Sequence, residues 1–108
     1  METQRLKQLF DFHEKNPEDT FVVFALAQEL LKKGDLERSE EFFNKLLRID
    51  EKYGGAYYHL GKLYEKKGEM GKAVKIYKKG IDINSTLGDQ HAVGELNQAL
   101  LNIDEDAI

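Results

Sequence analysis

Apolar residues recur at helical spacing along most of the chain. In two stretches they fall at i, i+3, i+4 and i+7, which places them on one face of a helix. The first set is Val23, Leu26, Ala27 and Leu30, and the second is Tyr57, Leu60, Gly61 and Tyr64. A further apolar face follows each set: Leu36, Phe43, Leu46 and Leu47 after the first, and Met70, Ala73, Ile76, Tyr77 and Ile81 after the second. The pattern predicts an all-α protein built from pairs of helices.

A short polar turn separates the two helices of each pair. It reads Lys-Lys-Gly-Asp at 32–35 and Lys-Lys-Gly-Glu at 66–69. The lysines complement the negative end of the first helix, and the glycine can adopt the left-handed conformation that ends it. Asp35 can cap the helix that follows. Each pair is therefore expected to form a helical hairpin.

The two hairpins repeat at a fixed interval. Gly34 and Gly68 lie 34 residues apart, and the apolar positions keep the same register. A period of this length is typical of helical repeat proteins. A lone helix from about Glu2 to Lys15 precedes the repeats and corresponds to the second helix of a pair. The predicted organisation is one domain, 1–108, with a half-repeat helix at 1–17, repeats at 20–53 and 54–87, a capping helix at 88–103 and a tail at 104–108.

Local signals mark the ends of the flanking helices. Asn16 closes the first helix, and Pro17 is expected at the start of the next one, because proline is favoured at the first helical position. Gly88 and Asp89 read as a helix stop followed by a new N-cap. The helix after them does not match the first helix of a repeat, so we expect it to cover the last hairpin. The acidic tail is expected to fray.

Ala27 and Gly61 occupy the same place in the two repeats, and both are small. An isolated glycine inside a helix costs about 1 kcal/mol relative to alanine, so it needs a structural reason. Two helices approach closely only where a side chain is small or absent, which supplies that reason. We therefore expect both residues to lie buried between helices and to take no part in ligand contact.

These residues resemble the tetratricopeptide repeat, a 34-residue family with a signature of aromatic, Leu-Gly and Tyr in its first helix and of Ala and an aromatic in its second. The second repeat matches the signature well, and the first is more degenerate, with Val23 for the aromatic and Ser39 for Ala. The layout looks like that of small stand-alone bacterial members. The resemblance implies about six helices in a right-handed stack of antiparallel hairpins, whose first helices line a concave groove that binds a peptide. The matching residues of the second repeat are Tyr57, Leu60, Gly61, Tyr64, Gly68, Ala73 and Tyr77.

The groove candidates lie on the helical stripe beside the packing stripe of each first helix. An aromatic ring next to a cation is suited to an acidic or C-terminal peptide. The alternative is that the phenylalanines pack against the N-terminal helix and that the charged residues form a solvated face with i, i+3 or i, i+4 ion pairs. The candidates are Phe21, Phe24, Gln28 and Leu31 in the first repeat and Tyr58, His59, Lys62, Glu65 and Lys66 in the second.

One known activity of the family is disfavoured. The carboxylate clamp that heat-shock co-chaperones use requires Lys and Asn where this chain has Phe24 and Gln28, and Asn where it has His59. It also draws on a third repeat for its last two cations. The resemblance therefore implies a protein partner whose identity the sequence does not give, and not a chaperone tail.

Composition excludes several other classes of function. Apolar residues make up 41% and charged residues 33% of the 108, which is typical of a folded domain, and the net charge of −4 disfavours nucleic acid and anionic membrane. There is no cysteine, no signal-peptide pattern and no apolar run long enough for a membrane span, so a cytoplasmic location is expected. His13, His59 and His91 fall in different predicted helices without a second ligand at metal spacing. We expect no enzyme activity, no cofactor and no metal.

Two other functions remain as alternatives. The open faces at the ends of so short a stack can pair into a homodimer, with a seam formed by Ile108 or by the Leu100, Leu101 and Ile103 cluster. A locally basic stripe raises nucleic acid binding as a weaker alternative, although lysines on exposed helical faces ordinarily serve solubility. The stripe comprises Lys62, Lys66, Lys67, Lys72, Lys75, Lys78 and Lys79.

Overall fold

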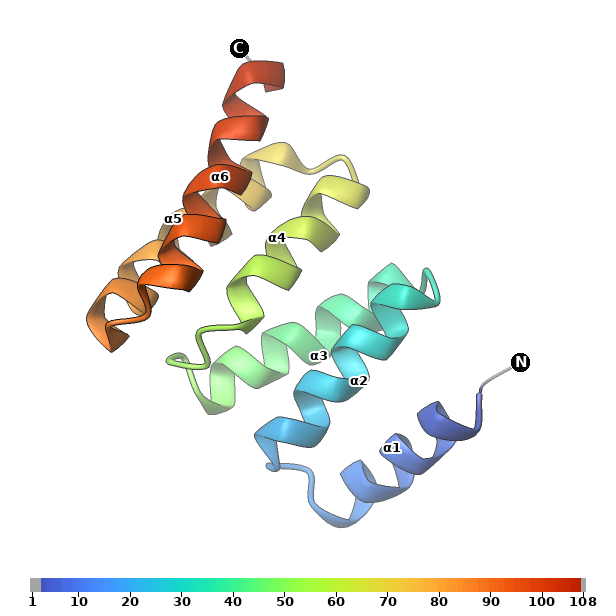
Figure 1. The fold of residues 1–108 in the computed structure, drawn as a ribbon. Coiled ribbons are helices and arrows are strands. Elements are labelled where there is room, and N and C mark those ends of the chain that lie inside the picture. The colour runs from blue at the N-terminus through green and yellow to red at the C-terminus, as the bar shows by residue number, and fades with distance from the viewer. Residues whose placement is uncertain (1–2, 108) are drawn as a thin grey trace. The chain divides into compact units, whose positions relative to one another are not determined.

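The computed structural model describes residues 3–107 of the chain, with side chains from 3 to 103. Over this range it contains six helices and no strand, which confirms the all-α prediction (Figure 1). The helices group into two compact units, Met1–Glu51 and Lys52–Ile108. Their bounds are α1 Gln4–Lys15, α2 Thr20–Lys32, α3 Leu36–Ile49, α4 Ala56–Lys66, α5 Met70–Leu87 and α6 Gln90–Ala107.

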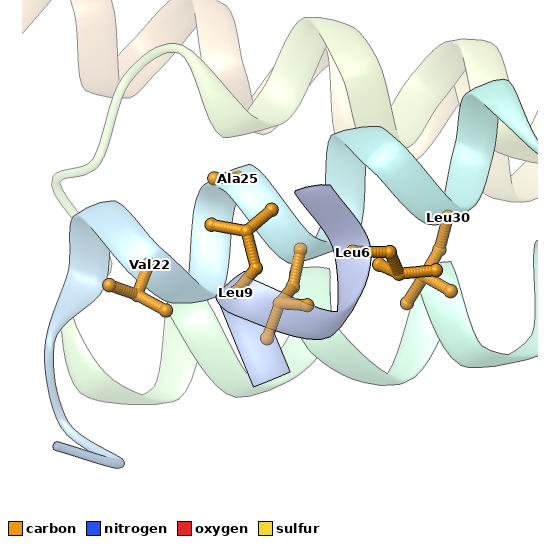
Figure 2. Close-up of a cluster of buried hydrophobic side chains, with 6 residues drawn as sticks. Leu6, Leu9, Val22, Ala25 and Leu30 are labelled. Atoms are coloured by element: carbon orange, nitrogen blue, oxygen red, sulfur yellow. The ribbon is translucent and has the colours of Figure 1, made fainter. Parts of the chain in front are cut away.

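Unit 1 consists of α1 and the hairpin formed by α2 and α3. One face of α1 packs on α2 and buries a small apolar cluster (Figure 2). Within the hairpin, Ala27 is fully buried, and the Ser39 hydroxyl donates a hydrogen bond of 2.7 Å to its carbonyl oxygen. The expected close approach at Ala27 is therefore present. The cluster on α1 and α2 consists of Leu6, Leu9, Val22, Ala25, Leu26 and Leu30.

The turn between α2 and α3 forms as its residues predict. Gly34 has φ of +83°, and its backbone N–H donates to the Leu31 carbonyl oxygen. Asp35 is the N-cap of α3, because one carboxylate oxygen accepts from the Arg38 backbone N–H at 3.2 Å. The other oxygen accepts from Arg38 Nε at 2.7 Å. The cap therefore combines a backbone bond with an ion pair.

Asp35→Ala is expected to lower the free energy of unfolding by about 1 kcal/mol, because α3 loses its cap. The bonds from Arg38 hold the pKa of the Asp35 carboxyl below its ordinary value of 3.8 in the folded protein. The stabilisation by the charge is thus complete above that ordinary value and is lost as the pH falls through the lowered one. Urea unfolding of both proteins at neutral and acidic pH tests this prediction. The difference between them should shrink in acid, and a constant difference would contradict the charge effect.

Pro17 does not start a helix, so that prediction is wrong. Pro17 lies in the turn after α1, and α2 begins at Thr20. The cause is Asp19, whose side chain accepts from the backbone N–H groups of Phe21 and Val22 and thereby caps α2. This cap sets the first helical residue three positions after the proline.

Unit 2 consists of the hairpin of α4 and α5 together with α6, which packs on α5. Gly61 and Gly80 are both buried, and each faces a tyrosine of the other helix. A Cβ added to Gly61 would lie 2.1 Å from Cε1 of Tyr77, and one added to Gly80 would lie 2.5 Å from Cβ of Tyr57. Glycine is therefore required where α4 and α5 cross, as the sequence predicts for Gly61.

A buried asparagine and a left-handed glycine fix the second half of unit 2. The Asn84 side-chain amide donates to the carbonyl oxygens of Gly54 and Gly80, which ties the end of α5 to the start of α4. Gly88 has φ of +77° and ends α5, and Asp89 accepts from the Ala92 backbone N–H, as predicted for a stop and a new cap. The helical backbone of α6 continues to Ala107, through most of the segment expected to fray, and residue 108 lies outside the described residues.

Candidate functional site

The clearest group of candidate residues lies on one face of α4 in unit 2. Tyr58, Lys62 and Glu65 follow one another at i, i+4 and i+7, so the helix places them in one row. The Lys62 ammonium lies 5.5 Å from the centre of the Tyr58 ring and 3.6 Å from a Glu65 carboxylate oxygen. The side chains of Lys62 and Glu65 remain 36% and 25% exposed. The row is therefore both organised and open to a ligand.

Tyr77 of α5 supports this row from the protein interior. Its hydroxyl donates a hydrogen bond to the same oxygen of Glu65 that faces Lys62, and its ring lies 6.5 Å from that of Tyr58. Burial, followed by the hydrogen bond and the charge of Glu65, raises the pKa of the Tyr77 phenol well above its usual range. The phenol thus stays a donor at any physiological pH, and Glu65 is held in place on both sides.

His59 and Lys66 complete the set predicted on α4. The His59 ring is half-buried and meets the Tyr58 ring edge-on, with 5.6 Å between the centres. Burial lowers the pKa of His59, and the negative charge of Glu95 on α6 opposes that shift. Lys66 is exposed one turn beyond Lys62. His59 therefore touches the row through Tyr58, and Lys66 adds a positive charge beside it.

The candidates of unit 1 form a different environment. Phe24 is half-buried and packs edge-on against Phe43 of α3, with ring centres 6.4 Å apart. This ring contact lies within its own hairpin. Gln28 is half-buried on the next turn of α2. Phe21 is 69% exposed and lines a groove beside α1.

This groove was not predicted from the sequence. It has a volume of about 430 Å³ and lies between α1 and the start of α2. Phe12 of α1 is 58% exposed and lines it together with Phe21. The signal in the sequence is that Phe12 falls outside the apolar stripe of its helix, which is a reason to expect an apolar side chain in water. The other lining residues are Arg5, Gln8, Leu9, Asp19 and Val22.

The apolar residues proposed as a dimer seam on α6 separate in the structure. Leu101 is 59% exposed and Leu100 is half-buried, but Ile103 is buried inside unit 2 at 3%. Ile103 is therefore not part of an exposed seam, because it packs into the core together with Leu96 and Ala99. Ile108 lies outside the described residues.

Within residues 3–107, two further classes of site are not found. Among the side chains that the structure describes, 3 to 103, no three of His, Asp or Glu gather as a metal ion would need. None of the described helices combines the length and the apolar character that crossing a bilayer takes.

Comparison with known proteins adds evidence on the family. A family model described as tetratricopeptide repeat matches residues 22–53 and 54–87. The crystal structure of a tetratricopeptide repeat domain protein from Salinibacter ruber is similar at 39% identity with a TM-score of 0.76, covering 81% of this chain and 97% of that one. Among curated proteins, no significant match is found.

More distant structures share the fold alone. A protein from Bordetella parapertussis is 20% identical with a TM-score of 0.86, covering 98% of this chain and 91% of that one. YrrB, described as a tetratricopeptide repeat protein with an unusual peptide-binding site, is 22% identical with a TM-score of 0.64. That similarity covers 90% of this chain and 57% of YrrB.

Proposed function

The chain belongs to the tetratricopeptide repeat family, and on that premise we propose that the α4 face of unit 2 binds a segment of another protein. The fold supports a protein-interaction module in general, and proteins of this family are generally non-enzymatic scaffolds. The observation that carries the proposal is the row of Tyr58, Lys62 and Glu65, which is fixed from below by Tyr77 and remains partly exposed.

The chemistry of the row favours a partner that carries a carboxylate. Glu65 already accepts a hydrogen bond from Tyr77 and pairs with Lys62, so its charge is largely compensated within the protein. Lys62, Glu65 and Lys66 together then leave one net positive charge near the Tyr58 ring. An acidic side chain or a C-terminal carboxylate can pair with the lysines while a neighbouring apolar group packs on the ring.

Fixed side chains also reduce the cost of binding. Long side chains such as lysine lose rotamer freedom when they are immobilised in an interface, which costs about 0.5–1.5 kcal/mol each. Here the contacts of Lys62 with Tyr58 and Glu65 already restrict its side chain. YrrB shares the fold and is described as having a peptide-binding site, which supports a site of this class on such a scaffold.

Peptides selected by the protein from a random-peptide display library test the proposal. We expect selected peptides to be acidic, and Lys62→Glu to weaken their binding about tenfold or more in calorimetry, a loss of ~1.4 kcal/mol. Tyr58→Ala is expected to weaken it as well. Lys75→Glu is the matched control, because Lys75 is an exposed lysine on α5 outside the row. Equal affinity of all the variants, or no selected peptide at all, would refute the α4 assignment.

A further inference from the structure

Two helices have no hairpin partner among the described residues. In the 34-residue register, α1 corresponds to α3 and α5, the second helices of the two hairpins. It packs on α2 without a first helix of its own. At the other end, α6 packs on α5 in the place of a first helix, and no described second helix follows it. The two lone helices are therefore of opposite kinds.

The lone helix α1 presents an aromatic side chain to solvent. Phe12 is 58% exposed and lines the groove described above together with Phe21, which is 69% exposed. Large apolar side chains exposed next to one another mark surfaces that are covered by a partner. Phe12 stands two repeat lengths before Gly80, so α1 carries an aromatic ring at the position where α5 carries the buried glycine.

The lone helix α6 presents a face that contains an uncovered glycine, Gly94. Four of its exposed residues lie at the i, i+3, i+4 and i+7 spacing of a packing face: Gly94, Asn97, Gln98 and Leu101. A Cβ added to Gly94 would meet nothing within 4 Å. Gly61 and Gly80 differ, because each is covered by a tyrosine from the opposite helix of its hairpin. An uncovered glycine inside a helix costs about 1 kcal/mol relative to alanine without the close packing that explains the other two.

The two open faces match in shape. In the α4 and α5 hairpin, Tyr57 of the first helix covers Gly80 of the second. A pair made from α6 and α1 also combines a glycine with an aromatic residue. Here the glycine, Gly94, lies on the first helix and the aromatic residue, Phe12, lies on the second. Leu101, which is 59% exposed, adds apolar surface to the open face of α6.

The two helices also match in charge. Helix α1 carries Arg5, Lys7 and Lys15 against Asp11 and Glu14. The segment 90–108 carries four acidic residues, Glu95 and the run at 104–106, and neither lysine nor arginine. Antiparallel pairing, as in the hairpins, brings the C-terminal end of α6 to the start of α1, where Lys7 is exposed and Arg5 is paired with Glu29 of α2. Opposite charges at these ends favour that orientation over the reverse.

We propose that the open face of α6 binds α1 of a second copy of this chain, with Phe12 packed on Gly94. The pairing completes a hairpin from two molecules. It joins two different surfaces, so further copies either close a ring or extend an open chain. The pairing does not depend on the α4 site proposed above.

Sedimentation equilibrium over a range of concentrations tests this pairing. The average mass should rise with concentration from the 12.5 kDa of one chain. Phe12→Glu and Leu101→Glu should each stop this growth, because each blocks one of the two faces. A mixture of the two variants should form a heterodimer and nothing larger, since each retains the face that the other lacks. Met70→Glu, at a 40% exposed residue of α5, is the matched control and should assemble like the original chain.

Other outcomes overturn the pairing. A mass that stays at one chain at all concentrations excludes it. If only one of the two glutamate variants blocks assembly, the interface is symmetric and involves a single helix. Gly94→Ala separates packing from folding, because a methyl group fills the open position while alanine favours the helix. We expect it to weaken association about tenfold and to raise the midpoint of thermal unfolding of the dilute monomer. Unchanged association would show that Phe12 does not pack on Gly94.

Discussion

Tyr57→Ala is expected to lower the free energy of unfolding by about 3–5 kcal/mol, the range observed when a large buried aromatic side chain is removed. Tyr57 is fully buried, and its side chain covers Gly80 at the crossing of α4 and α5. Because Gly80 has no side chain to fill the space, the cavity would lie directly at the helix crossing. A loss of this size is a large share of the 5–15 kcal/mol that typically stabilises a domain. Urea unfolding followed by circular dichroism measures it.

The neighbouring tyrosine is the control for this prediction. Tyr58 is also a tyrosine of α4, but it is half-exposed. Its ring meets the His59 ring edge-on and lies under the Lys62 ammonium. Tyr58→Ala should cost about 1 kcal/mol, which is the scale of such ring contacts. Similar losses for the two variants would mean that burial of Tyr57 does not stabilise the hairpin. A loss of only this size would leave Tyr58→Ala folded, so the variant can be used in the binding experiment.

The hairpins could be predicted because their signals are local. Helical spacing of apolar residues and a glycine at each turn depend on residues that are close in the sequence. Gly34 and Gly68 do take positive φ, and the structure contains six helices over the described residues, as predicted. The close approach at Gly61 was also predictable, because a glycine inside a helix is costly unless close packing requires it, and Ala27 holds the equivalent place. Pro17 was misplaced because two capping signals compete there, and the side-chain bonds of Asp19 to two backbone N–H groups decide the start of α2.

The candidate site was predictable only as far as one helix carries it. Tyr58, Lys62 and Glu65 share a row by spacing alone, so the sequence places them together. The role of Tyr77 under Glu65 depends on how α5 crosses α4, which spacing within one helix does not contain. Exposure of Phe12 likewise depends on what packs around α1. A side chain off the apolar stripe signals exposure, but the groove itself forms only when α1 and α2 are both in place.

Gly61→Ala is expected to destabilise the protein by about 1–3 kcal/mol, although alanine is the better helix former by about 1 kcal/mol. The reason is the Tyr77 ring, which is fully buried and whose nearest carbon would lie 2.1 Å from the new Cβ. Ala27 shows that the equivalent place in unit 1 accepts a Cβ, so the requirement comes from the partner residue and not from the helix. Displacing Tyr77 would also weaken its hydrogen bond to Glu65 and loosen the row on α4.

Thermal and urea unfolding of four variants separates steric conflict from helix propensity. Gly71→Ala is the matched control, because Gly71 lies in α5 with open space around its Cβ position, and it should leave stability unchanged or slightly raised. Tyr77→Leu removes the ring atoms that conflict with the new methyl group. Combined with Gly61→Ala, it should therefore cost less than the sum of the two single losses, a favourable coupling of about 0.5–3 kcal/mol. Additive losses would show that the Tyr77 ring is not what excludes a Cβ at position 61. A Gly61→Ala protein that is more stable than the original would show that α4 and α5 do not cross at this glycine.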